Sequence, residues 1–455
     1  MSRLIEMRWP DHGRPACPPP LSQGELQARL GALRDRMEED GLGALAVYGD
    51  REHAANLHWT TGFDPRFEEA LLIVTPAEAH LLVGNECLPY AGLSPLVQAG
   101  AVRLHHVPSL SLPSQPRDGG LRIGEAVALA LPAGAALGVA GWKWLEQEEG
   151  GGHAVPDFLL APLRERAGAV RDATRLFMDP ATGLRATVGA AEIARMEFAN
   201  AMAARALRRL LGALREGITD FEAVEAAGIG GLPLSCHVTL ATGSRAWQGL
   251  SSPSGEILRR GVPLSVNIAH WGANLCRAGW VAGDEDDLPE AARDTLETFV
   301  LPYAAAMSEW CALMRPGVTG GEVWARMRTL LPDDPFGVTL NPGHLIGLDE
   351  WLSSPIAPDS AVPLRSGMAV QMDVIPTHPV HGSTRLEDGY VIADEGLRAE
   401  LDRDRPDLSA RIRARSVLMR DTLGFALPET LLPLSDTGGL LAPFLLRHER
   451  VVALD

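Results

Sequence analysis

The sequence predicts an α+β protein in which an N-terminal α/β domain precedes a larger domain of two similar halves. Helix-like and strand-like apolar patterns alternate over residues 21–180, as in a compact α/β unit. Over residues 181–400, one helix-start motif occurs twice, 100 residues apart, which is typical of an internal repeat. We expect residues 401–455 to form a C-terminal helix and a tail that packs on this second domain.

Hydrophobic spacing predicts the elements of the first domain. Four apolar side chains recur at helical spacing within Leu26–Met37, so a helix is expected there. Three short apolar runs are predicted to be strands, the last two of them forming a hairpin: 44–48, 70–75 and 79–83. Residues 1–20 are polar and rich in proline, and we expect them to be a loose leader.

The repeated motif combines a helix end with the start of the next helix. Its first copy is Arg215, Gly217, Thr219 and Glu222, and its second copy is Arg315, Gly317, Thr319 and Glu322. Glycine is common just after a helix end, and a threonine three residues before a glutamate forms a capping box. Capping boxes are common, and two of them can arise by coincidence. Four matched positions, each set following an apolar helical pattern, favour an internal repeat and a pseudo-two-fold domain.

Composition and charge limit the class of partner. The formal net charge is −17, which argues against unassisted binding to nucleic acid or to an anionic membrane. The five cysteines form no CxxC motif, so a reduced, cytoplasmic protein is expected. The first residues lack the apolar core of a signal peptide, and no apolar run is long enough to span a membrane. Small molecules or other proteins are the expected partners.

Three segments of the second half carry polar residues within or beside strand-like runs. They are SVNIAHWGANLCRAGW (265–280), NPGHLIGLDEWLSSP (341–355), and the stretch from SGMAVQMDVIP (366–376) to STRLEDGYVIADEG (383–396). Together with the repeat, these segments resemble the pita-bread fold of methionine aminopeptidase, aminopeptidase P, prolidase and creatinase. Residues 48–74 are similar to part of the N-terminal domain of prolidases and creatinases. The resemblance implies a curved antiparallel sheet covered by helices, and a homodimer whose N-terminal domain contributes to the partner's site.

In the metallo-members of this superfamily, two aspartates, one histidine and two glutamates hold a pair of divalent ions around an activated water. The resemblance places these five positions on Asn267, Ala278, His344, Asp373 and Glu387. An amide is a poor substitute for a bridging carboxylate, and alanine cannot ligate a metal. The resemblance therefore implies no two-metal site and no required cofactor, although His344, Asp373 and Glu387 can together hold one divalent ion.

Two further histidine positions of the family are also changed. A peptidase histidine seven residues after His344 falls on Trp351, and a histidine near the substrate in peptidases and creatinase falls on Leu250. Creatinase hydrolyses a C–N bond without metal, and Asn267 and Ala278 resemble the pattern of creatinase and ectoine hydrolase, which lacks the aspartate pair. Leu250 leaves the position of creatinase's catalytic base empty, so that mechanism does not transfer directly.

The residues themselves favour an acid–base role for His344, Asp373 and Glu387. Asp373 interrupts an apolar strand, where a carboxylate needs a polar partner. A lone histidine is usually structural, but His344 follows a Pro-Gly turn within the motif described above. Two carboxylates that lie close together raise one of their pKa values, which suits a general acid paired with a general base. The case for Glu387 depends on the family segment alone.

Four residues are predicted to bind the substrate: Asn267, Trp280, Trp351 and Arg245. Trp280 is in phase with Ala278 along its strand, so it is expected to face the same cavity as Trp351. Buried tryptophan is common in plain packing, but an aromatic wall that faces carboxylates suits a small organic cation. Arg245, in a predicted loop, is the candidate partner for a substrate carboxylate.

Three functions remain open from the sequence. The leading one is a hydrolase that acts on an amide- or amidine-type C–N bond of a small molecule, for which a cation is one candidate. The second is an inactive pseudo-peptidase that binds a small ligand or a protein partner. The third is a single-metal Xaa-Pro peptidase that cleaves a proline-containing dipeptide. Metal content separates the third from the others, and turnover separates the first from the second.

Overall fold

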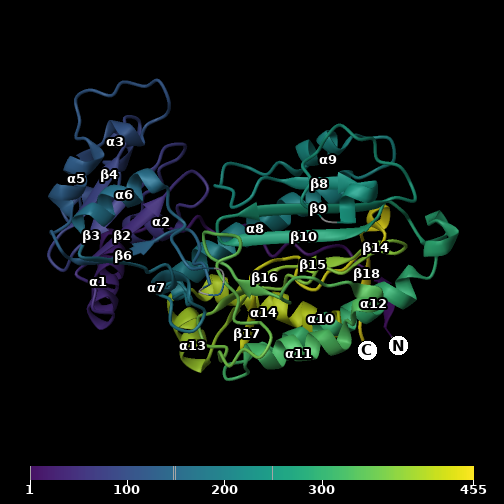
Figure 1. Cartoon of the computed structure of the whole chain (residues 1–455). Coiled ribbons are helices and arrows are strands. Elements are labelled where there is room, and N and C mark those ends of the chain that lie inside the picture. The colour runs from purple at the N-terminus through teal and green to yellow at the C-terminus, as the bar shows by residue number, and fades with distance from the viewer. Residues whose placement is uncertain (1, 147, 149, 248) are drawn as a thin grey trace. The chain divides into compact units, whose positions relative to one another are not determined.

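The computed structural model describes residues 2–146, 148, 150–247 and 249–455, and the chain divides into two compact units (Figure 1). The N-terminal unit comprises Pro19–Arg185. The C-terminal unit comprises Ala186–Asp455 together with residues 2–18. No helix among the described residues combines the length and the hydropathy that a membrane span requires.

The N-terminal unit is built on a six-stranded sheet with the strand order β5-β4-β3-β2-β6-β7. Its strands are β2 (Ala44–Gly49), β3 (Ala70–Val74), β4 (Ala79–Val83), β5 (Arg103–His106), β6 (Ala136–Ala140) and β7 (Ala169–Asp172). Strands β2, β3 and β4 pair antiparallel, whereas β2–β6, β6–β7 and β4–β5 are parallel pairs. The three predicted strands are therefore confirmed, including the hairpin of β3 and β4.

Helices accompany this sheet in the order that the alternating pattern predicts. They are α1 (Gln23–Glu39), α2 (Ala55–Thr61), α3 (Cys87–Ala91), α4 (Pro95–Gln98), α5 (Ile123–Ala130), α6 (Asp157–Arg166) and α7 (Arg175–Met178). Helix α1 begins with a capping box between Ser22 and Glu25, which satisfies two free backbone N–H groups. Its apolar stripe is buried, at Leu26, Leu30, Leu33 and Met37. The α/β prediction for this part of the chain is confirmed.

The C-terminal unit contains two four-stranded antiparallel sheets, ordered β15-β10-β9-β8 and β11-β12-β16-β17. The first consists of β8 (Thr239–Thr242), β9 (Pro263–His270), β10 (Ala273–Trp280) and β15 (Arg385–Glu387). The second consists of β11 (His344–Leu345), β12 (Ala369–Gln371), β16 (Gly389–Ile392) and β17 (Leu431–Pro433). A small hairpin is formed by β13 (Thr377–His378) and β14 (Gly382–Ser383).

Helices of the C-terminal unit follow the repeat. They are α8 (Ala190–Ala213), α9 (Asp220–Ala227), α10 (Leu301–Leu313), α11 (Gly320–Leu330), α12 (Asp333–Phe336), α13 (Glu395–Asp404) and α14 (Pro406–Val417). Thr219 caps α9 and Thr319 caps α11, and both form a reciprocal capping box. Gly217 and Gly317 share a left-handed backbone, with φ of 91° and 92°. Helix α8 ends before Gly217, so the glycine lies in the turn rather than at the helix cap. The two halves therefore repeat in structure as the sequence predicts.

The N-terminal leader differs from the loose segment that composition suggested. Arg3–Glu6 form β1, which pairs antiparallel with β18 (Arg450–Ala453), and the two chain ends lie side by side in Figure 1. Trp9 is buried, and its indole N–H donates to the carbonyl oxygen of His448 at 2.7 Å. The partner strand lies at the opposite end of the chain, so local composition could not reveal the pairing. Met1 lies outside the described residues.

The two sheets of the C-terminal unit meet where the family-like segments converge. Strand β15 leads through a single residue into β16, and so connects one sheet to the other. Gln371 on β12 donates its amide N–H to the backbone carbonyl of Asn274 on β10. Beneath this junction, Ile193 of α8 packs with Val391 of β16 and Ile412 of α14. The polar residues that the sequence singles out lie at this junction.

Candidate active site

The structure brings together the three residues that the sequence assigns to acid–base work. His344 opens β11, Asp373 follows β12, and Glu387 ends β15. One nitrogen or oxygen atom from each of them lies within 4.8 Å of the others. All three side chains are buried. A histidine and two carboxylates thus share one small interior volume.

Local backbone geometry sets the position of His344. Gly343 has φ of 112°, and a Cβ there would come within 2.8 Å of the carbonyl oxygen of Gln371, so only glycine fits without strain. The indole N–H of Trp310 donates to the carbonyl of Pro342 at 2.7 Å. His344 then pairs in register with Gln371. The Pro-Gly turn therefore places His344 beside β12, the strand that precedes Asp373.

The imidazole of His344 is oriented by a backbone contact. Its Nδ1 lies 3.0 Å from the carbonyl oxygen of Leu345, so Nδ1 carries a proton and Nε2 faces the site. Nε2 lies 3.4 Å from Glu350 Oε1 and 3.8 Å from Asp373 Oδ2. Burial lowers the pKa of His344, but the two carboxylates outweigh burial and raise the pKa above its ordinary value. Trp351 stacks on the imidazole, with ring centroids 4.2 Å apart.

Glu350 is a site residue that the sequence reasoning missed. Its carboxylate approaches His344 and accepts a hydrogen bond from Asn274 Nδ2 at 2.9 Å. Burial raises the pKa of Glu350, but the contact with His344 outweighs it, and the pKa lies below its ordinary value. Its position directly before Trp351, which was singled out, is the one signal that could have identified it.

Two amide side chains hold Glu387. Asn274 Nδ2 donates to Glu387 Oε1 at 2.8 Å, and Gln371 Nε2 donates to the same oxygen at 3.3 Å. Burial raises the pKa of Glu387 well above its ordinary value, and the nearby charge of Asp373 adds to this. Burial also raises the pKa of Asp373, to about 6. Asp373 Oδ1 has no hydrogen-bond partner among the described residues.

Cys276, rather than Ala278, lies in the cross-strand row of Asn267 and Glu387. The resemblance placed the second metal-ligating aspartate on Ala278, but Ala278 pairs with Ser265 and Arg385. Cys276 is the residue in register with both Asn267 and Glu387. The two-residue turn between β9 and β10 places Cys276 opposite Asn267 and Ala278 opposite Ser265. Across β9, β10 and β15, this row therefore consists of the Asn267 amide, the Cys276 thiol and the Glu387 carboxylate.

The thiol of Cys276 is buried beside a cation. Burial raises its pKa, although the guanidinium of Arg385 opposes this. Arg385 Nη1 lies 3.8 Å from Cys276 Sγ, and Nη2 donates to the carbonyl of Trp247 at 2.6 Å. A thiol with a raised pKa is protonated at neutral pH and is a poor metal ligand. Arg385 brings a positive charge to the same side of the sheet as Glu387.

The predicted substrate-binding residues separate into two groups. Trp351 stacks on His344, and Asn267 lies two strands from Glu387 in the same row, with its Oδ1 buried and unpartnered among the described residues. Trp280 instead packs at the end of β10 in a hydrophobic cluster with Phe444 and other residues. Arg245 lies in a short 3-10 helix (Gly243–Trp247), where it donates to Ser252 and Ser254 and pairs with Glu256. Trp351 therefore contacts the histidine, whereas Trp280 packs in the hydrophobic cluster.

His344, Asp373 and Glu387 offer the nitrogen and oxygen ligands that a divalent metal ion requires. His344 Nε2 and Asp373 Oδ1 are buried and lack hydrogen-bond partners among the described residues, as ligand atoms do when their ion is removed. Together with Glu387 they fit one ion of the kind that accepts imidazole and carboxylate. In the cross-strand row with Glu387, Asn267 and Cys276 offer an amide and a thiol rather than carboxylates for a second ion.

Comparisons with known proteins agree with this fold. Residues 194–394 match the model of metallopeptidase family M24. The prolidase from Pyrococcus horikoshii OT3 superposes with a TM-score of 0.62 at 16% identity, covering 80% of this chain and 95% of that one. The dipeptidase PepE from Mycobacterium ulcerans superposes with a TM-score of 0.63 at 21% identity, covering 84% and 95%.

A third solved structure extends the same likeness. The Xaa-Pro dipeptidase from Bacillus anthracis superposes with a TM-score of 0.61 at 17% identity, covering 81% of this chain and 96% of that one. None of the curated proteins matches the sequence significantly. The matched residues span both halves of the internal repeat, and the fold agreement confirms the pita-bread prediction. Residues 194–394 thus match a peptidase M24 domain, and the chain shares the fold of the solved prolidase and dipeptidase structures.

Proposed function

We propose that the protein hydrolyses an amide- or amidine-type C–N bond of a small molecule without a two-metal centre. The superfamily supports a hydrolase that acts on amide bonds. One observation carries the finer proposal: His344, Asp373 and Glu387 converge in a buried cluster, next to an ionised Glu350. Such a cluster contains the proton donors and acceptors that C–N cleavage needs.

The distribution of protons supports an acid–base division of labour. Hydrolysis of a C–N bond requires a base that takes a proton from water and an acid that protonates the leaving nitrogen. Asp373, with a pKa of about 6, is largely ionised at neutral pH and can act as the base. Burial and the charge of Asp373 raise the pKa of Glu387 well above its ordinary value, which favours its protonated form as the acid, and both amide donors contact Oε1, which leaves Oε2 free to carry a proton. The environments thus separate two carboxylates into two roles.

The substrate proposal follows from the groups around this cluster. Trp351 stacks on the imidazole of His344, and Oε1 of Glu350 lies 3.4 Å from its Nε2. An aromatic face near a carboxylate suits a small organic cation, such as an amidinium or guanidinium. Solved structures of similar fold are titled prolidase and Xaa-Pro dipeptidase, so a proline-containing dipeptide is the other substrate to test. We further propose that the protein is a cytoplasmic homodimer, as its superfamily resemblance and reduced cysteines suggest.

A single-metal hydrolase is the second candidate, favoured by the tautomer of His344. With Nδ1–H directed at the carbonyl of Leu345, Nε2 presents a lone pair toward Asp373, as in metal-bound histidines. His344, Asp373 and Glu387 would hold the ion. A divalent ion there would supply Lewis-acid polarisation of a carbonyl and a more acidic water.

Metal analysis combined with turnover tests both candidates. Protein purified without chelator is assayed for bound metal, and then for hydrolysis of Gly-Pro and of small amides, amidines and guanidines. We expect less than stoichiometric metal, and turnover that a chelator does not reduce. A stoichiometric ion whose removal abolishes turnover would establish the single-metal candidate instead. Tight binding of a panel compound without any turnover would indicate the inactive pseudo-peptidase.

A further inference from the structure

The C-terminal unit carries a basic groove, although the formal net charge of the chain is −17. The groove has a volume of about 680 Å³ and is bounded by residues 8–11, by helix α8 and by the chain that precedes β18. Its basic residues are Arg8, Arg205, Arg208, Arg209 and His448, and its acidic residues are Asp11 and Glu449. The local charge is therefore opposite in sign to that of the whole molecule.

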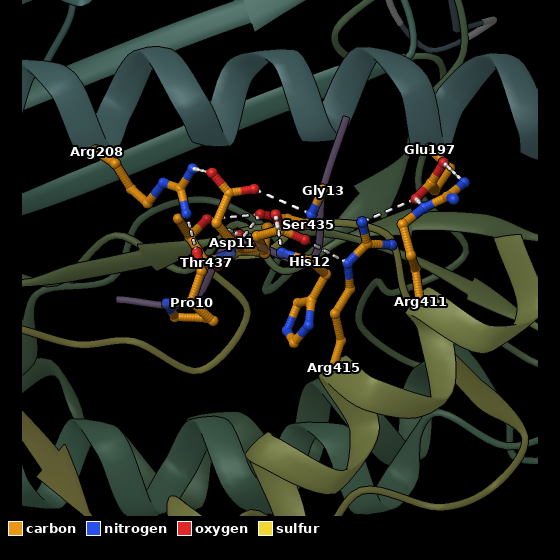
Figure 2. A network of polar contacts seen from close by, with 12 residues as sticks. Pro10, Asp11, His12, Gly13, Glu197, Arg208, Arg411, Arg415, Ser435 and Thr437 are labelled. Carbon is orange, nitrogen blue, oxygen red and sulfur yellow. Dashed lines mark hydrogen bonds and ion pairs between the residues drawn. The ribbon is translucent and has the colours of Figure 1, made fainter. Parts of the chain in front are cut away.

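The side chains of three of these arginines have no direct partner. Arg208 is paired, because its Nη2 lies 2.6 Å from Asp11 Oδ2 (Figure 2). Within the part of the chain that the structure describes, the side chains of Arg8, Arg205 and Arg209 form no hydrogen bond or ion pair, although Arg205 also acts on Asp11 at longer range. Arg205, Arg208 and Arg209 lie at positions i, i+3 and i+4 of α8, so their like charges share one helix face and repel one another. A bound anion would relieve this repulsion.

The walls of the groove are held in place from both ends of the chain. Trp9 and His448 are joined by a hydrogen bond and by an edge-to-face ring contact with centroids 5.8 Å apart. The backbone N–H of His12 donates to Asp436, which also accepts from Arg415 Nε at 2.8 Å (Figure 2). Strand β1, just before the groove, is paired with β18. A site with fixed walls loses less conformational entropy when a ligand binds.

A second cavity of about 420 Å³ adjoins the groove. Arg205 and Arg209 line both spaces. The second cavity also has apolar lining residues: Phe198, Met202, Ile229 and Leu232. Arg14 adds one more basic group at its edge, and Arg14 too has no hydrogen bond or ion pair among the described residues. The two cavities together offer a cationic end and an apolar end.

We propose that these joined cavities bind an organic phosphate at a site separate from the candidate active site. Its phosphate would lie against Arg8, Arg205 and Arg209, and its apolar part would enter the second cavity. Guanidinium groups match phosphate oxygens in bidentate geometry. A phosphate dianion also neutralises more of the three unpaired charges than a single carboxylate does. Each of the two volumes is in the range of ordinary small-molecule sites.

Calorimetric titration of the full chain tests the proposal with three probes: phenyl phosphate, inorganic phosphate and benzoate. Phenyl phosphate is expected to bind most tightly, because it alone has both a dianion and an apolar part. The double variant Arg205→Gln/Arg209→Gln is expected to weaken its binding by about tenfold or more, since two charge-assisted contacts are lost. The matched control is Arg326→Gln/Arg328→Gln on α11, which removes the same charge from another helix and leaves the affinity unchanged.

A second variant distinguishes a loss of binding from a folding defect. Arg8→Gln lies outside any helix and is expected to weaken phenyl phosphate binding while the melting temperature stays unchanged. Absence of saturable phenyl phosphate binding to the wild type overturns the proposal. So does binding that survives in both variants, or that weakens equally in the α11 control. If phenyl phosphate does not bind and the double variant alters the oligomeric mass, the groove holds an acidic surface of a second copy, and the proposal fails.

Discussion

Strands β10 and β15 have two buried faces with opposite chemistry. Cys276 and Glu387 face the candidate active site, whereas their neighbours Arg277 and Asp388 face away from it. On the rear face, Arg277 donates to Asp388 Oδ2 at 2.7 Å and to four backbone carbonyl oxygens. On the site face, Asp373 Oδ1 and Asn267 Oδ1 are buried, and neither accepts a hydrogen bond from the described residues.

The contrast shows that burial alone does not identify a functional group. Both faces bury charges, but on the rear face each charge meets an opposite charge or a hydrogen-bond partner. On the site face, carboxylates lie near one another and their pKa values are raised, an arrangement that is unfavourable for stability. We therefore expect changes on the site face to reduce turnover, and changes on the rear face to reduce stability.

The largest effect is expected from Asp373→Asn on the site face. The amide keeps the shape of the side chain but cannot take a proton, so turnover of the substrate found in the panel should fall about 10²- to 10⁴-fold. The melting temperature should stay the same or rise, because a buried carboxylate is removed. Arg326→Ala, at an exposed ion pair on α11, is the control and should retain activity. Undiminished turnover by Asp373→Asn would refute the acid–base role.

The next largest effect is expected from Asp388→Ala on the rear face. It leaves the guanidinium of Arg277 buried without its counter-charge, which should lower the free energy of unfolding by about 3–5 kcal/mol. Asp388→Asn keeps a hydrogen-bond acceptor and should cost less. Urea denaturation of the three proteins measures the differences. A loss below about 1 kcal/mol, as for an exposed pair, would show that the rear face does not hold the strands together.

The pH dependence of stability should also distinguish the two faces. Burial raises the pKa of Asp373 from 3.8 to about 6, so between these values the folded state binds more protons than the unfolded state. Asp373 alone should therefore lower stability by up to about 3 kcal/mol as pH rises from about 4 to 6, and the raised pKa of Glu387 should add a further fall that Asp373→Asn retains. Asp373→Asn should lack the part of the fall that Asp373 contributes. Urea denaturation of chelator-treated protein at pH 4, 5, 6 and 8 measures it, and parallel curves would contradict the pKa.

Sequence reasoning found the part of the site that depends on local signals. His344 was recognisable from its Pro-Gly turn, and Asp373 from its interruption of an apolar strand. Glu350 was not, because it reaches His344 only after the chain reverses, where Leu345 bridges to Ser353. The strand phase of Trp280 was the basis for placing it at the site. Phase does not reveal that the far end of the strand lies in a hydrophobic cluster.

The register between paired strands was the main feature that the sequence did not determine. An eleven-residue spacing placed the second ligand position on Ala278, and the two-residue turn between β9 and β10 brings Cys276 into the row instead. The loop lengths that decide such a shift are not visible without the paired strands. The same limit applies to the N-terminal leader, whose partner β18 lies at the other end of the chain.

The register at Cys276 leads to the smallest and most specific effect. Asn267→Asp/Cys276→Asp would complete a row of three carboxylates with Glu387, and should add one bound divalent ion per chain. Asn267→Asp/Ala278→Asp adds the same two carboxylates, but Ala278 lies one row away beside Arg385, so it should add none. Manganese titration followed by elemental analysis compares the two variants. If the Ala278 variant gains the ion and the Cys276 variant does not, the original spacing is right and the register argument fails.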